Sequence, residues 1–367
     1  MGNDSVIYIR TDGNSKIATG HIVRCLCIAQ ALEELGKKVC FLVSDDTSFN
    51  LLQDLSNSIV HETTFSFESM ILKSAVYDNL ELEIEELRYL LAENKPIIFI
   101  DSYYVTETYL EALKKIAIVA YMDDLRSFDY DVDLVINYDV IPPSKEEEYK
   151  KSYTKARTTL LGAQYTPLRK QFQNQRIVLK DNIKNVLITT GGSDPYHFSE
   201  SMTSLLVSQN LDMNIHLVVG RLFDNFETLK ILADRYPNIY LYQNVKNMAA
   251  LMKQCDFAIS AAGTTLYELC ALGIPAISFT FANNQVIMAE TFAETGAVPY
   301  AGDLRNPIDA TSSTSSNETN CHICNCVLEY LNSFISDVNK RLSQHHIMLQ
   351  LTTGDGAIKI AKALCSL

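Results

Sequence analysis

The stretch "IYIRTDGNSKIATGHIVRCLCIAQAL", Ile7 to Leu32, decides the fold. It begins as a short apolar run, continues through a polar loop that contains two glycines, and ends in a helical pattern that opens at His21. A strand that passes through such a loop into a helix is the opening step of a parallel sheet with helices on both faces. Backbone amides at the start of such a helix can bind anionic oxygens, so the loop is a candidate ligand site.

The order of strand and helix repeats along the chain. Helices are predicted near residues 22–36, 84–93 and 107–115, and the series restarts at "NVLITTGG" after the polar stretch "RKQFQNQRIVLKDNIK". A chain of 367 residues also exceeds what one hydrophobic core usually supports. We therefore predict an α/β protein with doubly wound parallel-sheet domains in residues 1–167 and 183–345, and a helix in 346–367 that can pack on either domain. Ligands are expected at the carboxyl ends of the strands, in the cleft between the domains.

The composition excludes several classes of protein. A formal net charge of −13 disfavours nucleic acid binding, which requires a basic surface. No apolar run approaches the roughly 20 residues that span a bilayer, and the beginning of the chain lacks the pattern of a signal peptide. We therefore expect a cytoplasmic protein without membrane insertion. Most of the nine cysteines lie in apolar segments, which fits reduced thiols.

The segment "DATSSTSSNETNCHICN", residues 309–325, is rich in serine, threonine and asparagine and predicts a flexible surface loop before a helix near Val327. Its C-H-x-C-x-C pattern is too crowded for the separated ligand pairs of a structural zinc site. The sequence also contains no Walker lysine loop, and we expect no cofactor. No metal site is therefore expected at Cys321, His322, Cys324 and Cys326.

The first loop offers a candidate general base. Asp12 ends the first strand, and Gly20 and His21 begin the first helix. The positive end of the helix dipole disfavours a protonated imidazole there, which leaves His21 able to accept a proton. The alternative is that His21 only caps the helix or packs at its start.

Two loops in the second half are candidates for binding phosphate and sugar. The glycines of "LITTGGSDP" permit close approach of backbone to a phosphate, and Glu268 in "ISAAGTTLYEL" can accept two hydrogen bonds from a ribose. For the glycine loop, the alternative is an ordinary turn between strand and helix. For Glu268, the alternative is a capping box with Thr265. The candidate binding residues are Gly20, Gly191, Gly192, Ser193, Ala262, Gly263, Thr264, Thr265, Glu268, Asn284 and Gln285.

Acidic residues follow two further strands of the first half. Asp101 follows the apolar run that opens "FIDSYYV", and Asp123 and Asp124 end "IAIVAYMDD". Such carboxylates can orient a base or bind sugar hydroxyls. They can equally cap the next helix, which is the more common role.

Taken together, these motifs resemble the UDP-2,4-diacetamido-2,4,6-trideoxy-β-L-altropyranose hydrolases of pseudaminic acid synthesis and the related spore-coat polysaccharide proteins. The resemblance rests on "RTDGNSKIATGHIVRCLCIAQAL", "FIDSYYV", "MDD", "LLGAQYTPLRKQF", "TTGGSDP", "ISAAGTTLYEL" and "NNQ" in that order. It covers about residues 5–300 and returns at "GDGAIKIAKAL". The short motifs "GGS" and "AAGTTLYE" are also shared with glycosyltransferases of the MurG type.

The resemblance implies a GT-B fold of two Rossmann-like domains, with UDP held mostly by the second. It implies that His21 is the catalytic base for a water that attacks the anomeric carbon. Asp12 on the same loop, and Asp101 and Tyr103 beside the sugar, are the other candidate catalytic residues. Direct attack by water predicts inversion, and a leaving group as good as UDP needs no metal. Glu268 would bind the ribose, and Asn284 and Gln285 the sugar or phosphate. A monomer or weak oligomer is expected. The chain departs from the family at Ala18, where a glycine is common, and Tyr104 competes with Tyr103 for its role.

Two other functions remain open. A GT-B glycosyltransferase would pass the sugar to an acceptor, and a binding protein would need no base. The helix after His21 carries only Arg24 as a basic residue before Lys37, and we find no basic amphipathic helix in the first 150 residues. This pattern disfavours a membrane-bound transferase.

Overall fold

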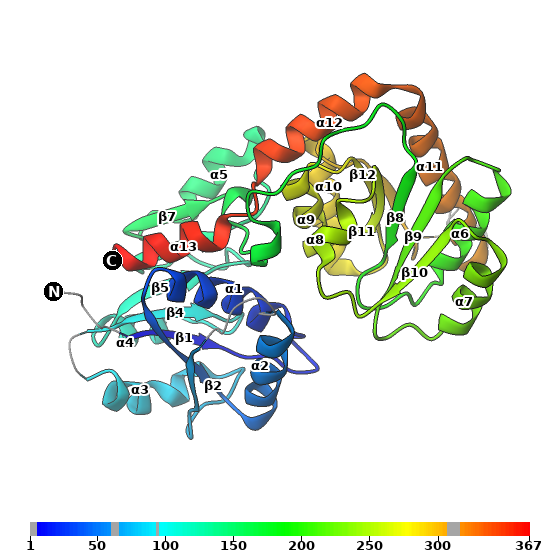
Figure 1. The fold of residues 1–367 in the computed structure, drawn as a ribbon. Coiled ribbons are helices and arrows are strands. Elements are labelled where there is room, and N and C mark those ends of the chain that lie inside the picture. The colour runs from blue at the N-terminus through cyan, green and yellow to red at the C-terminus, as the bar shows by residue number, and fades with distance from the viewer. Residues whose placement is uncertain (1–5, 60–65, 93–94, 307–315) are drawn as a thin grey trace. The chain divides into compact units, whose positions relative to one another are not determined.

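The structure, a computed structural model, describes residues 6–59, 66–92, 95–306 and 316–367 (Figure 1). It divides into two compact units. The first comprises Met1–Lys170 together with Gly354–Leu367, and the second comprises Gln171–Thr353. No helix among the described residues is long and apolar enough to cross a membrane.

The first unit is built on a parallel sheet of seven strands in the order β3-β2-β1-β4-β5-β6-β7. Its strands are β1 (Val6–Thr11), β2 (Lys38–Val43), β3 (Glu68–Ile71), β4 (Ile97–Asp101), β5 (Ile118–Met122), β6 (Leu134–Asn137) and β7 (Thr158–Leu161). Its α-helices are α1 (Gly20–Glu34), α2 (Asp46–Ile59), α3 (Ile84–Leu90), α4 (Glu107–Lys114), α5 (Glu146–Lys151) and α13 (Gly356–Cys365).

Alternation along the strands gives this sheet a core on each face. In β1, Ile7 and Ile9 face the core formed with α1, α2 and α13, whereas Tyr8 faces the core formed with α3 and α4. The C-terminal helix α13, red in Figure 1, therefore belongs to the first unit. A Cβ on Gly356 would lie 2.2 Å from the carbonyl oxygen of Thr166, so glycine permits the close packing at the start of this helix.

The second unit contains a parallel sheet of six strands in the order β10-β9-β8-β11-β12-β13. The strands are β8 (Asn185–Thr189), β9 (Asn214–Val219), β10 (Ile239–Gln243), β11 (Phe257–Ala261), β12 (Ala276–Thr280) and β13 (Tyr300–Asp303). The helices are α6 (Phe198–Ser208), α7 (Phe226–Arg235), α8 (Met248–Met252), α9 (Thr264–Leu272), α10 (Asn283–Glu294), α11 (Ser316–Ser336) and α12 (Val338–Leu351).

Each sheet reverses its strand order once, between β1 and β4 in the first unit and between β8 and β11 in the second. In an open α/β sheet such a switch point opens a crevice at the carboxyl ends of the strands, where ligands bind. Every candidate loop named from the sequence follows one of these four strands or β5 and β12, which lie beside them.

The structure differs from the sequence prediction in several places. The elements that were not predicted are α2, β3, α5, β7, α10 and β13. α11 begins at Ser316 instead of near Val327, so residues 316–325 are helical and not loop, while residues 309–315 of the predicted loop lie outside the described residues. The segment predicted as one helix in 346–367 is divided, because α12 continues to Leu351 in the second unit and α13 belongs to the first.

Candidate active site

His21 is positioned by an ordered loop, residues 12–20, which joins β1 to α1. The side chain of Asn14 accepts hydrogen bonds from the backbone N–H groups of Lys16 (2.8 Å) and Ile17 (3.1 Å), which closes a tight turn. α1 then begins immediately before His21, whose side chain is 4% exposed. The position at the start of the helix is therefore as predicted.

Ala18 in this loop adopts a left-handed conformation, with φ at 57°. Glycine occupies this region without the steric cost that a Cβ imposes. We expect Ala18→Gly to stabilise the first unit by about 0.5 to 1 kcal/mol, since relief of strain outweighs the added freedom of the unfolded chain. Urea unfolding monitored by circular dichroism measures the change, with Ala29→Gly inside α1 as a control that should destabilise. An unchanged or lowered midpoint for Ala18→Gly would contradict the prediction.

The imidazole of His21 faces the end of β4. Its Nδ1 lies 2.6 Å from Oδ1 of Asp101, and the ring of Tyr103 meets it edge-on with centroids 4.4 Å apart. An ionised carboxylate can only accept, so this short contact requires a proton on Nδ1, and in the neutral ring the lone pair is then on Nε2. In the part of the chain that the structure describes, no residue donates a hydrogen bond to Nε2. A histidine held in this way can act as an oriented general base.

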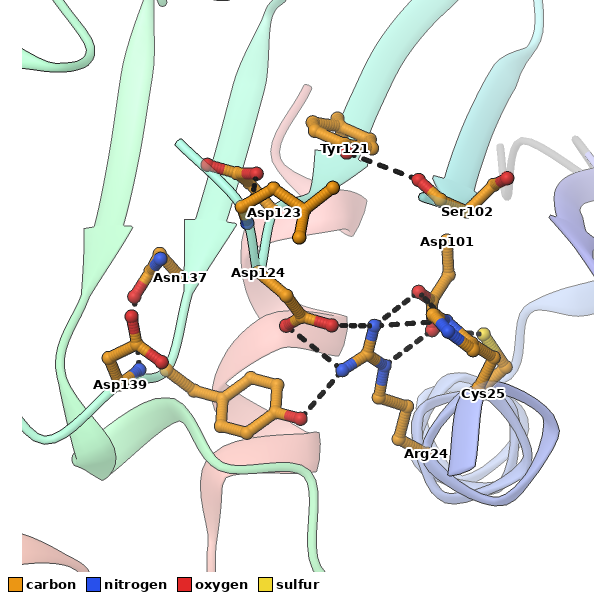
Figure 2. Close-up of polar contacts among 12 residues, drawn as sticks. Arg24, Cys25, Asp101, Ser102, Tyr121, Asp123, Asp124, Asn137 and Asp139 are labelled. Carbon is orange, nitrogen blue, oxygen red and sulfur yellow. Dashed lines mark hydrogen bonds and ion pairs between the residues drawn. The ribbon is translucent and has the colours of Figure 1, made fainter. Parts of the chain in front are cut away.

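Arg24 joins this pair to the ends of the next two strands (Figure 2). Its Nε donates to Oδ2 of Asp101 at 2.5 Å, and its Nη2 pairs with Oδ1 of the same carboxylate. The guanidinium also donates to Asp124 at 2.7 and 3.0 Å and to the hydroxyl of Tyr138 at 2.6 Å. One side chain of α1 is thus tied to residues that follow β4, β5 and β6.

The side chains of Asp101 and Arg24 are largely buried. Burial works against ionisation of Asp101, but Arg24 and then His21 outweigh it and hold the pKa of this carboxyl well below its ordinary value. Burial likewise works against the Arg24 cation, but Asp101 and Asp124 raise the pKa of Arg24 well above its ordinary value. Burial and the charge of Asp124 raise the pKa of Tyr103, so its phenol remains a donor at neutral pH.

Asp12 does not join this group. One carboxylate oxygen accepts from the backbone and hydroxyl of Ser44 at 2.7 and 2.9 Å, and the other accepts from Nη1 of Arg10 at 2.5 Å. Arg10 is itself buried and bonded to Glu83, which also accepts from Tyr109. The contacts of Asp12 therefore belong to a buried network that ties β1 to β2 and to the segment before α3.

The structure separates the roles of neighbouring residues in two motifs. Asp123 accepts from the hydroxyls of Tyr130 and Tyr153 and from the backbone after it, so its role is structural, although it does not cap a helix as the alternative supposed. Asp124 instead contacts Arg24. Of the paired tyrosines, Tyr103 contacts His21, while Tyr104 packs edge-on against Tyr77 with ring centroids 5.6 Å apart.

Sequence reasoning missed Arg24 and Tyr138 as members of the site. The signal for Arg24 was present, because it is the only charged residue between Ile22 and Leu32 and lies one helical turn after His21. A charge that must enter a core needs partners. Tyr138 follows β6 and carries no comparable signal.

In the second unit the glycine loop after β8 has the geometry of a backbone cradle. Gly191 adopts a φ of 83°, and no atom would lie within 4 Å of a Cβ on Gly192. The hydroxyl of Thr190 donates to the carbonyl of Ser193 at 2.9 Å, which closes the turn. Gly220, at the end of β9, approaches so closely that its Cβ would lie 2.4 Å from the carbonyl oxygens of both loop glycines. The loop is thus fixed on one side and open on the other.

The other candidates of this unit lie at two helix starts. Gly263 is the residue before α9, and Glu268 is buried one turn into that helix. At α10, Gln285 turns its side-chain oxygen back onto the backbone N–H groups of Phe281 (2.9 Å) and Ala282 (3.2 Å), while Asn284 is exposed. This oxygen of Gln285 is occupied by capping. The remaining candidates, Ala262, Thr264 and Thr265, lie at the start of α9, and Thr264 is exposed.

In the cysteine and histidine pattern of α11, Sγ of Cys326 lies 3.6 Å from Nε2 of His322. Cys324 is buried, and Cys321 lies outside the residues whose side chains are described. Among the described side chains no group of three or more histidine, cysteine or acidic residues is placed to hold a metal ion.

The comparison with protein families matches residues 185–300 to the glycosyltransferase family 28 C-terminal domain. The chain is 27% identical to the spore coat polysaccharide biosynthesis protein SpsG of Bacillus subtilis, over 98% of this chain and 97% of that protein. It is 23% identical to the UDP-2,4-diacetamido-2,4,6-trideoxy-β-L-altropyranose hydrolase of Campylobacter jejuni, over 79% of this chain and 97% of that one. These proteins are homologues of the chain over most of its length.

An uncharacterised protein of Methanocaldococcus jannaschii is 26% identical over 74% of this chain, which spans only 54% of that longer relative. Among solved structures, the MurG of Acinetobacter baumannii superposes with a TM-score of 0.64 at 13% identity, over 99% of this chain and 100% of that one. The predicted GT-B fold is therefore confirmed. At this identity the structural likeness shows the fold alone.

Proposed function

We propose that the chain hydrolyses a UDP-sugar, with UDP-2,4-diacetamido-2,4,6-trideoxy-β-L-altropyranose as the substrate to test first. The observation that carries the proposal is the contact between His21 and Asp101, which leaves Nε2 of a buried imidazole with a free lone pair. A protein that only binds a nucleotide sugar has no need of an oriented base. The substrate is suggested by the hydrolase homologue in Campylobacter jejuni.

In the proposed reaction Nε2 of His21 takes a proton from a water molecule as its oxygen attacks the anomeric carbon. The bond between that carbon and the UDP oxygen breaks, and the electron pair leaves with UDP. The free sugar is released with inverted configuration, and the imidazolium returns its proton to solvent. Asp101 holds the imidazole in place and stabilises its positive charge.

The second unit is proposed to bind UDP. The backbone N–H groups of the loop at Gly192 and of the start of α9 can stabilise charge on the departing phosphate. Glu268 is assigned to the ribose and Asn284 to the sugar or phosphate. Because UDP is already a good leaving group, the reaction is written without a metal, and UDP release in EDTA tests that point.

A glycosyltransferase is the second candidate, and the match of residues 185–300 to the glycosyltransferase family 28 domain favours it. The two reactions differ only in the acceptor. A transferase must place a sugar or lipid hydroxyl where the hydrolase places water.

The deciding experiment supplies the purified chain with the UDP-sugar and no acceptor, in water enriched in oxygen-18 and with EDTA. Hydrolysis predicts multiple turnovers of UDP, oxygen-18 in the anomeric hydroxyl of the free sugar, and inverted configuration in the first spectra. Tight UDP binding without turnover would favour the transferase.

Sedimentation of the same preparation tests the proposed monomer or weak oligomer, and cell fractionation tests the proposed cytoplasmic location.

Two glycine variants separate UDP binding from folding. In Gly192→Ala the new Cβ meets no atom within 4 Å, so the fold should be unchanged while the side chain obstructs a bound phosphate. In Gly220→Ala the Cβ would overlap the carbonyls of the glycine loop, and we expect a loss of about 1 to 3 kcal/mol in unfolding free energy. Calorimetric titration with UDP and urea unfolding measure both. Unchanged UDP affinity in Gly192→Ala would remove this loop from the binding site.

A further inference from the structure

Arg24 is an unusual residue for its place in the chain. It lies on α1 among apolar residues that form the core, its side chain is only 10% exposed, and it carries a charge that burial disfavours. A cation is retained in such a place when its partners compensate it. The partners of Arg24 lie at the carboxyl ends of three different strands: Asp101 at the end of β4, Asp124 after β5 and Tyr138 after β6. The carboxylate of Asp101 is also the group that contacts His21.

The contacts at Asp101 leave that carboxylate little freedom. Both of its oxygens pair with the guanidinium of Arg24, and the thiol of Cys25 donates to Oδ2 at 3.4 Å. A carboxylate clamped on both oxygens can present Oδ1 in only one direction. His21 meets that oxygen through Nδ1, so the direction of the imidazole is set by the clamp.

Arg24 also acts on His21 directly. Its Nη2 lies 3.1 Å from Nδ1 of the imidazole, and both nitrogens share Oδ1 of Asp101. A guanidinium has donors only. The guanidinium therefore lies beside the same ring nitrogen that contacts Asp101, and it occupies the second oxygen of that carboxylate as well. The other groups around the pair are Tyr103, which is edge-on to the ring, and Asp124 and Tyr138, which hold the far side of Arg24.

We propose that Arg24 is the positioning residue of the base: by clamping Asp101 on both oxygens, it fixes the direction of the His21 ring and holds the ring proton on Nδ1. Its role in turnover rests on the proposed function, but its effect on the imidazole exists without any substrate. An arginine that served only to stabilise the fold would leave the proton on His21 unaffected.

The test is nitrogen NMR of the histidine rings in the full chain, which reports directly which ring nitrogen carries a proton. The chain has seven histidines, and the His21 signal is identified by its loss in His21→Asn. Wild type, Arg24→Met, Arg24→Lys and the control Arg126→Met are compared at pH 7 without ligand. Arg126 also pairs with a carboxylate and packs on a tyrosine, but it lies outside this group.

We expect the Nδ1–H tautomer in the wild type and in Arg126→Met. Arg24→Met should give a mixture of the two tautomers, and Arg24→Lys a smaller change in the same direction. The kcat of UDP release by Arg24→Met should fall at least about 100-fold with little change in KM. If Arg24→Met fails to fold, Arg24→Lys supplies the comparison.

An Nε2–H tautomer in the wild type, or the Nδ1–H tautomer alone in a folded Arg24 variant, would overturn the proposal. If the ring changes as expected but neither protein releases UDP, the positioning role stands and the proposed hydrolysis fails.

Discussion

Replacing His21 by alanine is expected to lower the kcat of UDP release by about 10² to 10⁴, which is the contribution of a well-placed general base. The contacts of the imidazole are with Asp101 and Tyr103, which both belong to the first unit. UDP affinity, which we assign to the second unit, should therefore be unchanged. The expected signature is a loss of kcat with UDP binding retained.

His21→Asn sharpens this test, because asparagine can still donate to Asp101 but offers no basic nitrogen. Both variants should lose hydrolysis to a similar extent, and the rate of neither should recover at higher pH. His322→Asn, at an exposed histidine of α11, is the matched control and should behave as wild type. Retention of more than about a tenth of the wild-type rate by His21→Ala would rule out His21 as the general base.

Most strands were predictable because they are short, buried and rich in β-branched residues, and because glycine-containing loops mark where strand passes into helix. The edge strands β3, β7 and β13 were not predicted, and most of their residues are exposed or half-buried. α2 and the first turns of α11 were missed for a physical reason. Their sequences, "DTSFNLLQDLSNSI" and "SNETNCHICN", are rich in serine, asparagine and threonine, which have low helix propensity. In α11 it is the burial of Val327, Leu331 and Phe334 further along the helix that supports the structure.

The candidate site shows the same division. His21 and Asp101 were predictable, because each lies at a strand end or helix start, where parallel sheets place their ligands. Arg24 was signalled only as a lone charge in an apolar helix, and its role could not be predicted, because its partners Asp101, Asp124 and Tyr138 are far away in the chain. Asp12 illustrates the converse, since its place after β1 suggested chemistry while its contacts with Arg10 and Ser44 are those of a buried structural carboxylate.

The same clamp predicts a large effect on stability. Asp101→Asn keeps the shape of the side chain but removes one of the two carboxylate charges that compensate Arg24 in a buried position. Breaking a buried pair by removing one partner typically costs about 3 to 5 kcal/mol when the remaining charge is left without compensation. Because Arg24 keeps its contact with Asp124, we expect a decrease at the lower end of this range, about 3 kcal/mol, in unfolding free energy at pH 7, measured by urea unfolding. Glu147→Gln, which breaks an exposed pair with Lys150, should have no measurable effect.

The pH dependence distinguishes this charge effect from a loss of packing. The pKa of Asp101 in the folded protein is held well below the value of about 3.9 expected for an unfolded aspartate. The resulting stability is fully present above the unfolded pKa and is lost as the pH falls through the folded pKa. Wild type should therefore lose more stability than Asp101→Asn between pH 5 and the acid limit of folding, so the two curves converge as pH falls. Parallel curves would mean that the variant fails through packing, and that the charge on Asp101 does not stabilise the fold.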